Sequence, residues 1–590
     1  MEPHTVIVDS DKITFPDSTE QTTKAVRLAT LVVAANNSTA KSKAQADYVC
    51  DGTNDHVEIQ AALDALPATG GEVRLLEGTY NIEVSLVLDS YQTLRGCGRN
   101  TILTTTTADM IFLSAVGGLG TELTGIVIAD MQIDGGAGLL GDAGIYFEYV
   151  DYSLVQNVYS RRHASGTGTF LIGIFLLHSD FNTLLGNTCR ENGLGSALDS
   201  SNNNIVSSNI YLRNTDYGIY LSGALRNTIA ENDCRLNGHD GIIIETSGNN
   251  TIIANSCYGN DDYGISVVLS LNNTITENDC RLNGREGIEL DRSDNNIISN
   301  NNCFQNSQNT DNTYSNILAQ TSDYNLIEGN LCRAPTIGST LPDGGPIAET
   351  EIAVADTAGF EVGMGVVFDL GNGSGTEEYH RIVAITAGAP GVIVIEAGLT
   401  FIQAVGENID VPEARYGISI NDAGSDKNVV IGNDLYDSGK TANFNDAGTL
   451  TMVRDDNRGI DVIQVKHYVY VKNTSGTQRV AGDVVTIKGI ATAIEFTITA
   501  IQGDDKVYGM VAETIANNAS GYVLVKGFTD ALKVNGTIDI AIDDILGTFT
   551  TACIAMKAAA GDQGFALALE GYATDNSDGV IDAYIKSPWD

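Results

Sequence analysis

The sequence predicts an all-β protein built on a right-handed parallel β-helix, and three observations lead to this prediction. A repeat of about 23 residues runs through the middle of the chain and reads roughly N-x-I-x-x-N-x-C-x-x-N-x-x-x-G-I. Asn, Cys and Gly recur in fixed columns of this repeat. The apolar residues are mostly β-branched and fall in short runs between Asn, Gly, Ser and Asp, as in short strands joined by turns. A period this regular indicates a solenoid, in which each repeat buries its apolar face against its neighbours.

A leucine-rich repeat also has a period in the twenties and is the main alternative. That pattern requires Leu two positions after its Asn. This chain instead has the polar residues Asp216, His239, Asp262 and Arg285 there. The sequence therefore favours the parallel β-helix, with about 23 residues per coil.

The Asn columns are interpreted as structural ladders. Equivalent residues of successive β-helix coils lie about 4.8 Å apart, so identical side chains stack. Asn at a bend bonds backbone groups and tolerates left-handed dihedrals. The three columns are Asn204, Asn227, Asn250, Asn273 and Asn296; Asn209, Asn232, Asn255, Asn278 and Asn301; and Asn214, Asn237, Asn260, Asn283 and Asn306.

The cysteines follow the same repeat. Six of the nine occupy one repeat position, and the sequence contains no C-x-x-C pair. We therefore expect stacked, buried apolar thiols rather than disulfides or metal ligands, and assembly in a reducing compartment. The six are Cys189, Cys234, Cys257, Cys280, Cys303 and Cys332.

The first coil is expected to carry an N-terminal cap. Residues 55–66 have the apolar spacing of a helix and are followed by a Pro and a Gly-Gly pair. A helix at this place would cover the open sheet edge of the first coil. Residues 1–46 are polar and rich in Thr, Ser and Ala, which predicts an N-terminal arm or attachment segment.

Changes in pattern divide the rest of the chain. The predicted β-helix spans 47–333, and residues 334–412 replace the Asn columns with alternating strands and Gly turns, which indicates a small inserted β-domain. The coil pattern returns in 413–459, interpreted as a final coil and exit. Residues 460–590 are predicted to form a C-terminal β-barrel-like domain.

Charge and length exclude several function classes. The chain has 590 residues, 33 basic and 75 acidic, and a net charge of −42. Nucleic-acid or anionic-membrane binding is not expected, because phosphate contacts need clustered Lys and Arg. No apolar run is long enough for membrane insertion, and the start lacks a basic and apolar signal region, so a soluble protein is predicted.

The entry segment carries a family resemblance. Asp51, Gly52, Asp55, "IQAALDALPATGG", "LLEGTY" and "LRGCG" resemble the start of pectate-lyase-like β-helix proteins. That superfamily includes polysaccharide lyases, glycoside hydrolases, epimerases and phage tailspikes, so the resemblance implies a fold over 48–333 and leaves the activity open. C-terminal Gly-centred motifs such as "AGDVVTIKG" are similar to β-modules of phage decoration and fibre proteins. The combination resembles a virion appendage.

Polar residues before the turn Gly form the candidate catalytic set. Stacking places Asp240, Asp262 and Glu286 on successive coils, with His239 beside them as a proton carrier. Separations of roughly 5 and 10 Å along the coils bracket those that glycosidases need between two carboxyl groups. A solvated turn is the alternative reading, because turn positions are polar in any solenoid. The lyase-like Arg-x-Pro-x-x-Arg motif and the Asp-Pro-His motif of alginate epimerases do not occur.

Aromatic residues in the same region form the candidate glycan-binding set. Tyr217, Tyr220 and Tyr263 could stack on sugar rings, with Arg285 as a clamp. No metal site and no cofactor are expected, although a lyase-type site would hold Ca²⁺ among clustered carboxylates.

The preferred hypothesis is a structural surface protein of a phage or virus particle, as a spike, fibre or capsid decoration protein that binds host glycans. The expected partners are capsid or tail proteins of the virion and host surface polysaccharide, the expected oligomer is a homotrimer, and the expected location is the virion surface. One alternative is a polysaccharide depolymerase, a lyase or glycoside hydrolase acting on acidic glycans, on a particle or secreted to the extracellular space. Another is a cell-surface adhesin.

Overall fold

Parallel β-helix coils make up most of the chain. The computed structural model describes residues 30–136, 141–163, 171–342, 350–362, 364–368, 378–400 and 408–448, with short strands before residue 30, residue 348 and separate segments between 450 and 585. The chain divides into two compact units, Met1–Thr228 and Ile229–Asp590. Each unit contains three parallel sheets formed by successive coils, which confirms the predicted fold class.

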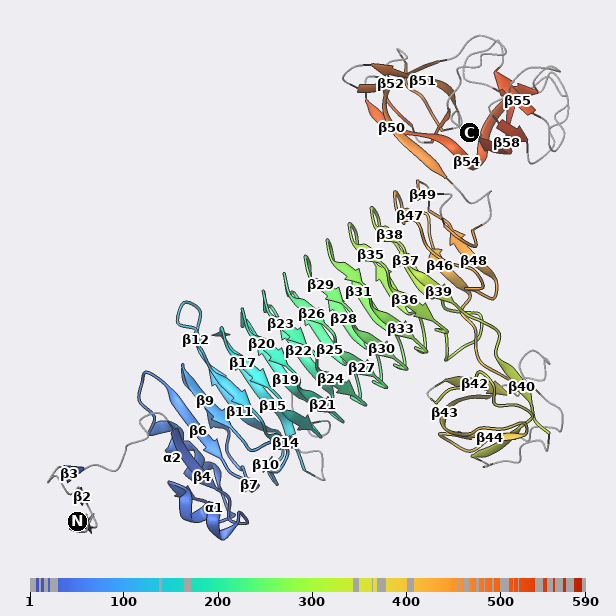
Figure 1. Ribbon diagram of the computed structural model, residues 1–590. Helices are drawn as coiled ribbons and strands as arrows, with labels where there is room; N and C mark the ends of the chain where they lie inside the picture. Colours follow the sequence, from blue (N-terminus) through green and yellow to red (C-terminus); the bar gives the residue numbers. More distant parts are fainter. Residues whose placement is uncertain are drawn as a thin grey trace, which may run out of the picture. The chain divides into compact units, whose positions relative to one another are not determined.

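In the first unit, each full coil gives one strand to each of three sheets, named sheets 1, 2 and 3 in chain order (Figure 1). Sheet 1 consists of β4 (Thr30–Ala34), β5 (Tyr48–Val49), β6 (Gly71–Leu75), β9 (Gln92–Arg95), β13 (Val127–Ala129), β17 (Leu154–Gln156), β20 (Thr183–Leu185) and β23 (Ile205–Ser207). Sheet 2 consists of β7 (Gly78–Asn81), β10 (Thr101–Thr104), β14 (Gln132–Asp134), β18 (Tyr159–Arg161), β21 (Thr188–Arg190) and β24 (Ile210–Leu212). Sheet 3 consists of β8 (Leu86–Val87), β11 (Met110–Val116), β15 (Gly141–Glu148), β19 (Ile172–Leu177), β22 (Leu194–Asp199) and β25 (Ile219–Ser222). A short parallel pair, β12 (Leu123–Thr124) with β16 (Val150–Asp151), extends two of the turns.

The N-terminal cap is present. The predicted helix forms as α2 (His56–Asp64), and it buries Ile59, Ala62 and Leu63 against the start of the coil, whereas Val57 remains exposed. A second helix, α1 (Ala40–Gln45), precedes it. The predicted arm contains an antiparallel sheet of β1 (Ile7–Asp9), β2 (Lys12–Thr14) and β3 (Glu20–Gln21), and the other residues before Thr30 lie outside the described residues.

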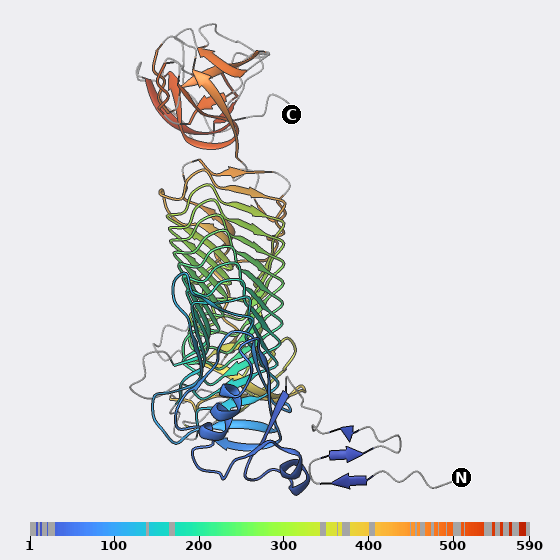
Figure 2. The ribbon, with the colours of Figure 1, turned by 90° about the vertical axis from the view of Figure 1, so that its left-hand side faces the viewer.

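The second unit repeats the three-sheet coil, and Figure 2 shows the successive turns edge on. Sheet 1 here consists of β29 (Thr251–Ile253), β32 (Thr274–Thr276), β35 (Ile297–Ser299), β38 (Leu326–Glu328), β47 (Val429–Ile431) and β49 (Met452–Val453). Sheet 2 consists of β27 (Asp233–Arg235), β30 (Ser256–Tyr258), β33 (Asp279–Arg281), β36 (Asn302–Phe304) and β39 (Leu331–Arg333). Sheet 3 consists of β28 (Ile242–Glu245), β31 (Ile265–Val268), β34 (Ile288–Asp291), β37 (Ile317–Gln320), β46 (Tyr416–Ile420) and β48 (Ala442–Asp446). Strand β26 (Thr228–Ala230) lies where the chain divides into units.

Buried Asn side chains connect the backbones of successive coils. The Asn255 side chain shows the pattern: its Oδ1 accepts the backbone N–H of Asn232 at 2.9 Å, and its Nδ2 donates to the carbonyl of Ile229 at 2.8 Å. The Asn278 side chain makes the same two bonds one coil later: it accepts the backbone N–H of Asn255 at 2.9 Å and donates to the carbonyl of Ile252 at 3.0 Å. The Asn columns therefore satisfy bend backbone groups that the sheets leave unpaired.

The cysteine column lines the interior of sheet 2. Cys234, Cys257, Cys280, Cys303 and Cys332 are successive cross-strand partners in the second unit. All five are fully buried free thiols, as predicted for apolar interior positions.

The repeated Gly before sheet 3 is required for a reason other than the predicted turn. Gly264 and Gly287 do not have positive φ. A Cβ on Gly264 would instead lie only 2.5 Å from the carbonyl oxygen of Gly287 in the following coil. Gly is therefore needed because adjacent coils approach closely at this point.

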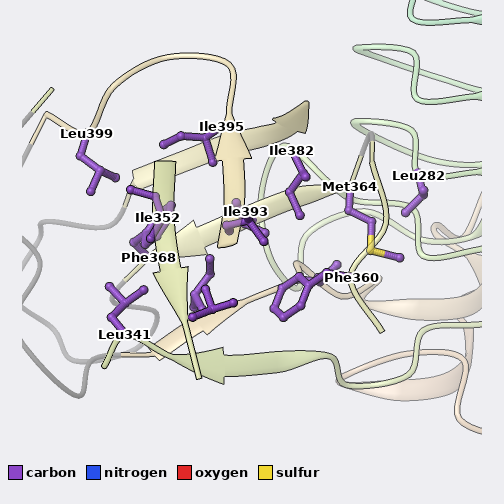
Figure 3. Close-up of a cluster of buried hydrophobic side chains, with 14 residues drawn as sticks. Leu282, Leu341, Ile352, Phe360, Met364, Phe368, Ile382, Ile393, Ile395 and Leu399 are labelled. Carbon is purple, nitrogen blue, oxygen red and sulfur yellow. The ribbon is translucent and has the colours of Figure 1, made fainter. Parts of the chain in front are cut away.

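The inserted β-domain is an antiparallel sheet between β39 and β46. Its strands are β40 (Gly338–Thr340), β41 (Glu351–Val354), β42 (Gly365–Phe368), β43 (Glu378–Thr386), β44 (Gly391–Ile395) and β45 (Asn408–Asp410). Figure 3 shows its apolar core, where Leu282 of a coil lies beside Met364 and Phe360 of the insert. Arg381 of the insert also pairs with Asp261 at 3.1 Å. The insert is therefore packed against the coils that precede it.

The coil resumes after the insert, because β46 pairs with β37 and β47 with β38. The segment predicted as the exit still forms strands β48 and β49, which pair with β46 and β47.

The C-terminal domain is a nine-stranded sheet. Its strands are β50 (His467–Asn473), β51 (Val484–Ile490), β52 (Ala493–Ile498), β53 (Gly509–Val511), β54 (Ser520–Asn535), β55 (Ile545–Thr548), β56 (Ala555–Lys557), β57 (Ala566–Ala568) and β58 (Asp578–Ile585). The strand order closes on itself twice, because β54 pairs with β50 and also with β58. Two small rings of strands thus share one long strand. In the described part of the chain, no helix has the length and apolar character needed to cross a membrane.

We expect Asn255→Ala to lower the free energy of unfolding by about 2–4 kcal/mol, because it leaves a buried N–H and a buried carbonyl without partners. Asn302→Ala is the matched control, since that half-buried amide donates to the Asp279 carboxylate at 2.9 Å and not to a backbone carbonyl of the described residues. Denaturant unfolding of both variants measures the difference. An equal loss of unfolding free energy in the two variants would show that the buried Asn ladder is no more stabilising than a half-buried side-chain hydrogen bond.

Candidate functional site

The candidate site lies where the chain enters sheet 3 of the second unit. Each coil places two polar residues before the close-packed Gly, and backbone bonds stack these positions: Asp262 N–H donates to the His239 carbonyl at 3.1 Å, and Arg285 N–H to the Asp262 carbonyl at 2.9 Å. The following outward position on the strands carries Ser266 and Glu289 as cross-strand partners. The fold therefore collects these side chains on one outer face of the coil.

Three of the predicted residues form a chain of contacts that includes the ion pair of Asp262 with Arg285, and we name it the ion-pair chain. The Asp262 carboxylate lies 2.9 Å from His239 Nδ1 and 3.0 Å from Arg285 Nε. The Arg285 guanidinium also lies over the rings of Tyr263 and Tyr314, at 5.4 and 5.7 Å from their centroids, and donates to Tyr263 Oη at 3.2 Å. Arg285 is thereby held between a carboxylate and two aromatic rings.

A cavity of about 250 Å³ opens beside this chain. Its wall combines the carboxyl groups of Glu286 and Glu289 with aromatic and cationic side chains from later coils. The principal lining residues are Tyr263, Glu286, Glu289, Tyr314, Arg415 and Tyr416. Aromatic rings with a few convergent polar groups are a feature of small-molecule sites, which makes this cavity the candidate site.

Burial raises the pKa of the two acids that line the cavity. Burial, with the neighbouring Glu289 charge, raises the pKa of Glu286 to about 8, although its carboxyl accepts the Ser315 N–H at 3.4 Å. Burial also raises the pKa of Glu289, against the hydrogen bond from Ser266 Oγ at 3.1 Å. Glu286 is therefore mostly protonated at neutral pH, which makes it a hydrogen-bond donor or an acid.

The predicted catalytic residues occupy different environments. Glu286 lines the cavity, and His239 and Asp262 lie in the adjoining ion-pair chain. Asp240 is buried, and its carboxyl accepts the backbone N–H of Tyr263 at 3.1 Å. Burial raises the pKa of Asp240 to about 7, and the nearby charges of Asp262 and Glu289 add to the effect.

The predicted glycan-binding residues fall in both units. Tyr263 lines the cavity of the second unit, and Arg285, which is not a lining residue, donates a hydrogen bond to its hydroxyl. Tyr217 and Tyr220 lie in the first unit, with ring centroids 5.8 Å apart. Tyr220 packs against a buried apolar cluster that includes Tyr146 and Phe175, which gives it a structural role.

Several lining residues were not predicted. Glu289 follows Glu286 by three positions and points outward. The alternation of inward and outward side chains along β34 could have predicted this direction. Tyr314 follows an irregular turn, and Arg415 and Tyr416 come after the whole inserted domain, so the 23-residue alignment did not reach them.

One group in the first unit has the composition of a metal site. Cys50, Asp55 and Glu58 each bring one ligand atom within 4.8 Å of the others. Both Asp55 oxygens already accept backbone N–H groups, from Gly52 at 2.8 Å and Asn81 at 2.8 Å. The buried Asp55 carboxylate is therefore explained by these two hydrogen bonds, which hold the chain in place before α2.

Comparisons with known proteins place the fold among β-helix proteins. The family model described as "Periplasmic copper-binding protein (NosD)" matches residues 105–280, less than half of the chain. A comparison with curated proteins gives no match.

Solved structures give broader matches. The Dettilon tailspike protein is 15% identical, with 91% of this chain and 92% of that chain covered and a TM-score of 0.50. The A-module of the mannuronan C-5 epimerase AlgE6 from Azotobacter vinelandii is 17% identical, covers 69% of this chain and 96% of that chain, and has a TM-score of 0.49. A Geobacillus virus E2 protein is 16% identical, with 60% and 75% covered and a TM-score of 0.40. At 15% identity, the match to the Dettilon tailspike protein shows a shared fold and nothing more.

The raised pKa of Glu286 predicts a pH-dependent stability. The carboxyl titrates near 4.5 when unfolded and near 8 when folded, so between these values the folded state holds more protons and stability falls as pH rises. Glu286→Gln removes this loss, and we expect it to raise the free energy of unfolding by a few kcal/mol at pH 8.5 and by much less at pH 4.

Unfolding of the parent and Glu286→Gln at both pH values measures this effect, and Glu277→Gln on an exposed position is the control. A gain that is the same at both pH values would contradict the assigned protonation.

Proposed function

We propose that this chain is a glycan-binding surface protein of the tailspike type, displayed on a virus particle. The observation that carries this proposal is the cavity on the outer face of sheet 3, where carboxyl, aromatic and guanidinium groups converge. The ligand is host surface polysaccharide.

The cavity offers complementary contacts to a sugar. The Tyr263 and Tyr314 rings supply apolar surface for a pyranose face, and the Glu286 and Glu289 carboxyls supply hydrogen bonds to hydroxyl groups. Because Glu286 is mostly protonated at neutral pH, it donates to an anionic sugar instead of repelling it. Arg285 and Arg415 add donors for a carboxylate, so an acidic sugar suits this cavity.

The arrangement of the chain supports a place on a virion. The Dettilon tailspike protein shares the fold over 91% of this chain. In our proposal, the terminal domains attach the protein to capsid or tail proteins, and three copies assemble into one appendage. The coil then presents its outer face to the host surface.

Binding of uronate-containing oligosaccharides and bacterial surface polysaccharides, measured by calorimetry, tests the proposal. We expect Tyr263→Ala and Arg285→Gln each to weaken binding about tenfold or more, through loss of sugar contact and of a charge-assisted hydrogen bond. Arg292→Gln is the control, because Arg292 is exposed and pairs with Asp291 at the opposite end of β34. Binding that survives both cavity variants would place the glycan elsewhere.

A second candidate, polysaccharide depolymerase, is favoured by one observation: Glu286, with a pKa of about 8, shares the cavity with a second carboxyl, Glu289. In a hydrolysis, Glu286 would give its proton to the glycosidic oxygen as the C–O bond breaks. Glu289 would direct water or form the new bond to the sugar carbon. Water then supplies the hydroxyl and restores the proton.

Release of reducing ends and the absorbance of unsaturated products measure this activity. Glu286→Gln and Glu289→Gln should each reduce turnover about 100-fold or more, whereas exposed Glu277→Gln should not. Asp240→Asn tests the buried acid outside the cavity. Polysaccharides that bind with the affinity pattern above but are never cleaved would leave binding as the sole function.

A further inference from the structure

A cluster of arginines on the first unit contrasts with the acidic character of the chain. Arg99, Arg161 and Arg190 gather around Tyr159 on the outer face of sheet 2, and Arg162 joins Arg161 at the Asp134 carboxylate. We name these four side chains the arginine patch. The register explains the meeting: Tyr159 and Arg161 of β18 face Thr188 and Arg190 of β21. The chain has 33 basic against 75 acidic residues, so four arginines at one place are a local reversal of its charge.

Arg99 reaches the patch from the turn between β9 and β10. Its guanidinium lies 4.2 Å from the centroid of the Tyr159 ring, and Nη2 lies 3.5 Å from Thr188 Oγ1. Arg161 lies 5.6 Å from the same ring centroid. The ring holds the guanidinium of Arg99 in place without neutralising its charge.

Two carboxylates face the four guanidiniums. Arg161 and Arg162 both bond the buried Asp134 carboxylate, at 2.7 Å from Arg161 Nη2 and 2.7 Å from Arg162 Nε. Burial alone would raise the pKa of Asp134, but hydrogen bonds from Arg162, Gly136 and Arg161 lower it below its ordinary value, so Asp134 is charged. Arg190 pairs with Glu191, and Arg99 forms no ion pair with any described residue. The patch therefore carries an excess of positive charge.

The side chains of the patch are exposed in part. The side chains of Arg161, Arg162 and Arg190 are 27–29% exposed, and Arg99 is exposed. A guanidinium fork bonds a carboxylate through two parallel N–H groups, and the Tyr159 ring fixes the orientation of the Arg99 fork in advance. In a chain whose net charge of −42 repels polyanions, such a patch provides a local attraction.

We propose that the arginine patch binds carboxylate groups of an acidic polysaccharide. Arg99 makes the direct contact, and Arg161, Arg162 and Arg190 supply the surrounding positive charge. This site consists of residues of the first unit alone. Its test therefore does not depend on whether the cavity that Glu286 and Glu289 line binds a glycan.

The test measures hexagalacturonate binding to the full chain at low ionic strength, in the parent and in an Arg285→Gln background that weakens the other proposed site. We expect Arg99→Gln to lower affinity about tenfold or more in both backgrounds and to flatten the salt dependence. Arg99→Lys should recover the salt dependence but only part of the affinity, because the charge remains and the fork is lost. Arg292→Gln, an exposed arginine of the second unit, is the matched control.

Three results would overturn the proposal. One is equal affinity of the parent and Arg99→Gln in both backgrounds, with unchanged thermal unfolding midpoints. Another is equal binding of neutral dextran. The third is tighter binding of a sulfated than of a carboxylated oligosaccharide of matched charge, which would reassign the patch to sulfate.

Discussion

The side-chain amide of a buried Asn, bonded to the backbone of adjacent coils, is the interaction on which the rest of this structure depends. A coil of short strands needs three bends, and every bend interrupts the sheet and leaves N–H and carbonyl groups away from water. An Asn accepts from one such group and donates to another, and the next Asn repeats the arrangement one coil later. These bonds fix the register, so a residue type that suits a position in one coil suits it in the next.

Fixed register also explains where chemistry can occur. Interior positions are filled with Ile, Val, Leu and Cys, and the bends with Asn and close-packed Gly. The outward positions before and within sheet 3 need neither an apolar side chain for the core nor Asn or Gly for a bend. Three successive coils place His239, Asp262 and Arg285 there, and their side chains bond one another although they are 23 residues apart in the sequence. The candidate site is therefore a product of stacking.

The sequence was sufficient for the coil and for part of the site. Period and composition predicted the parallel β-helix, the capping helix and the buried thiols, because each depends on a pattern repeated in register. The same reasoning brought Tyr263, Arg285 and Glu286 together. The repeat did not predict the lining residues Tyr314, Arg415 and Tyr416. An irregular turn interrupts it before Tyr314, and the whole inserted domain interrupts it before the other two. The exposure of Val57 depends on how the capping helix packs on the first coil, and the role of the repeated Gly depends on packing between coils. The periodicity of the sequence reports neither.

The C-terminal domain has a different organisation, with one 16-residue strand common to both of its rings. The first half of β54 pairs with β50 and the second half with β58, with a register shift between Thr529 and Leu532 in the second pairing. Removal of β54 opens both rings at once, so neither ring is closed without this strand. A force or a protease acting on one ring is then resisted by the pairing of the other, and the domain is expected to yield as a whole.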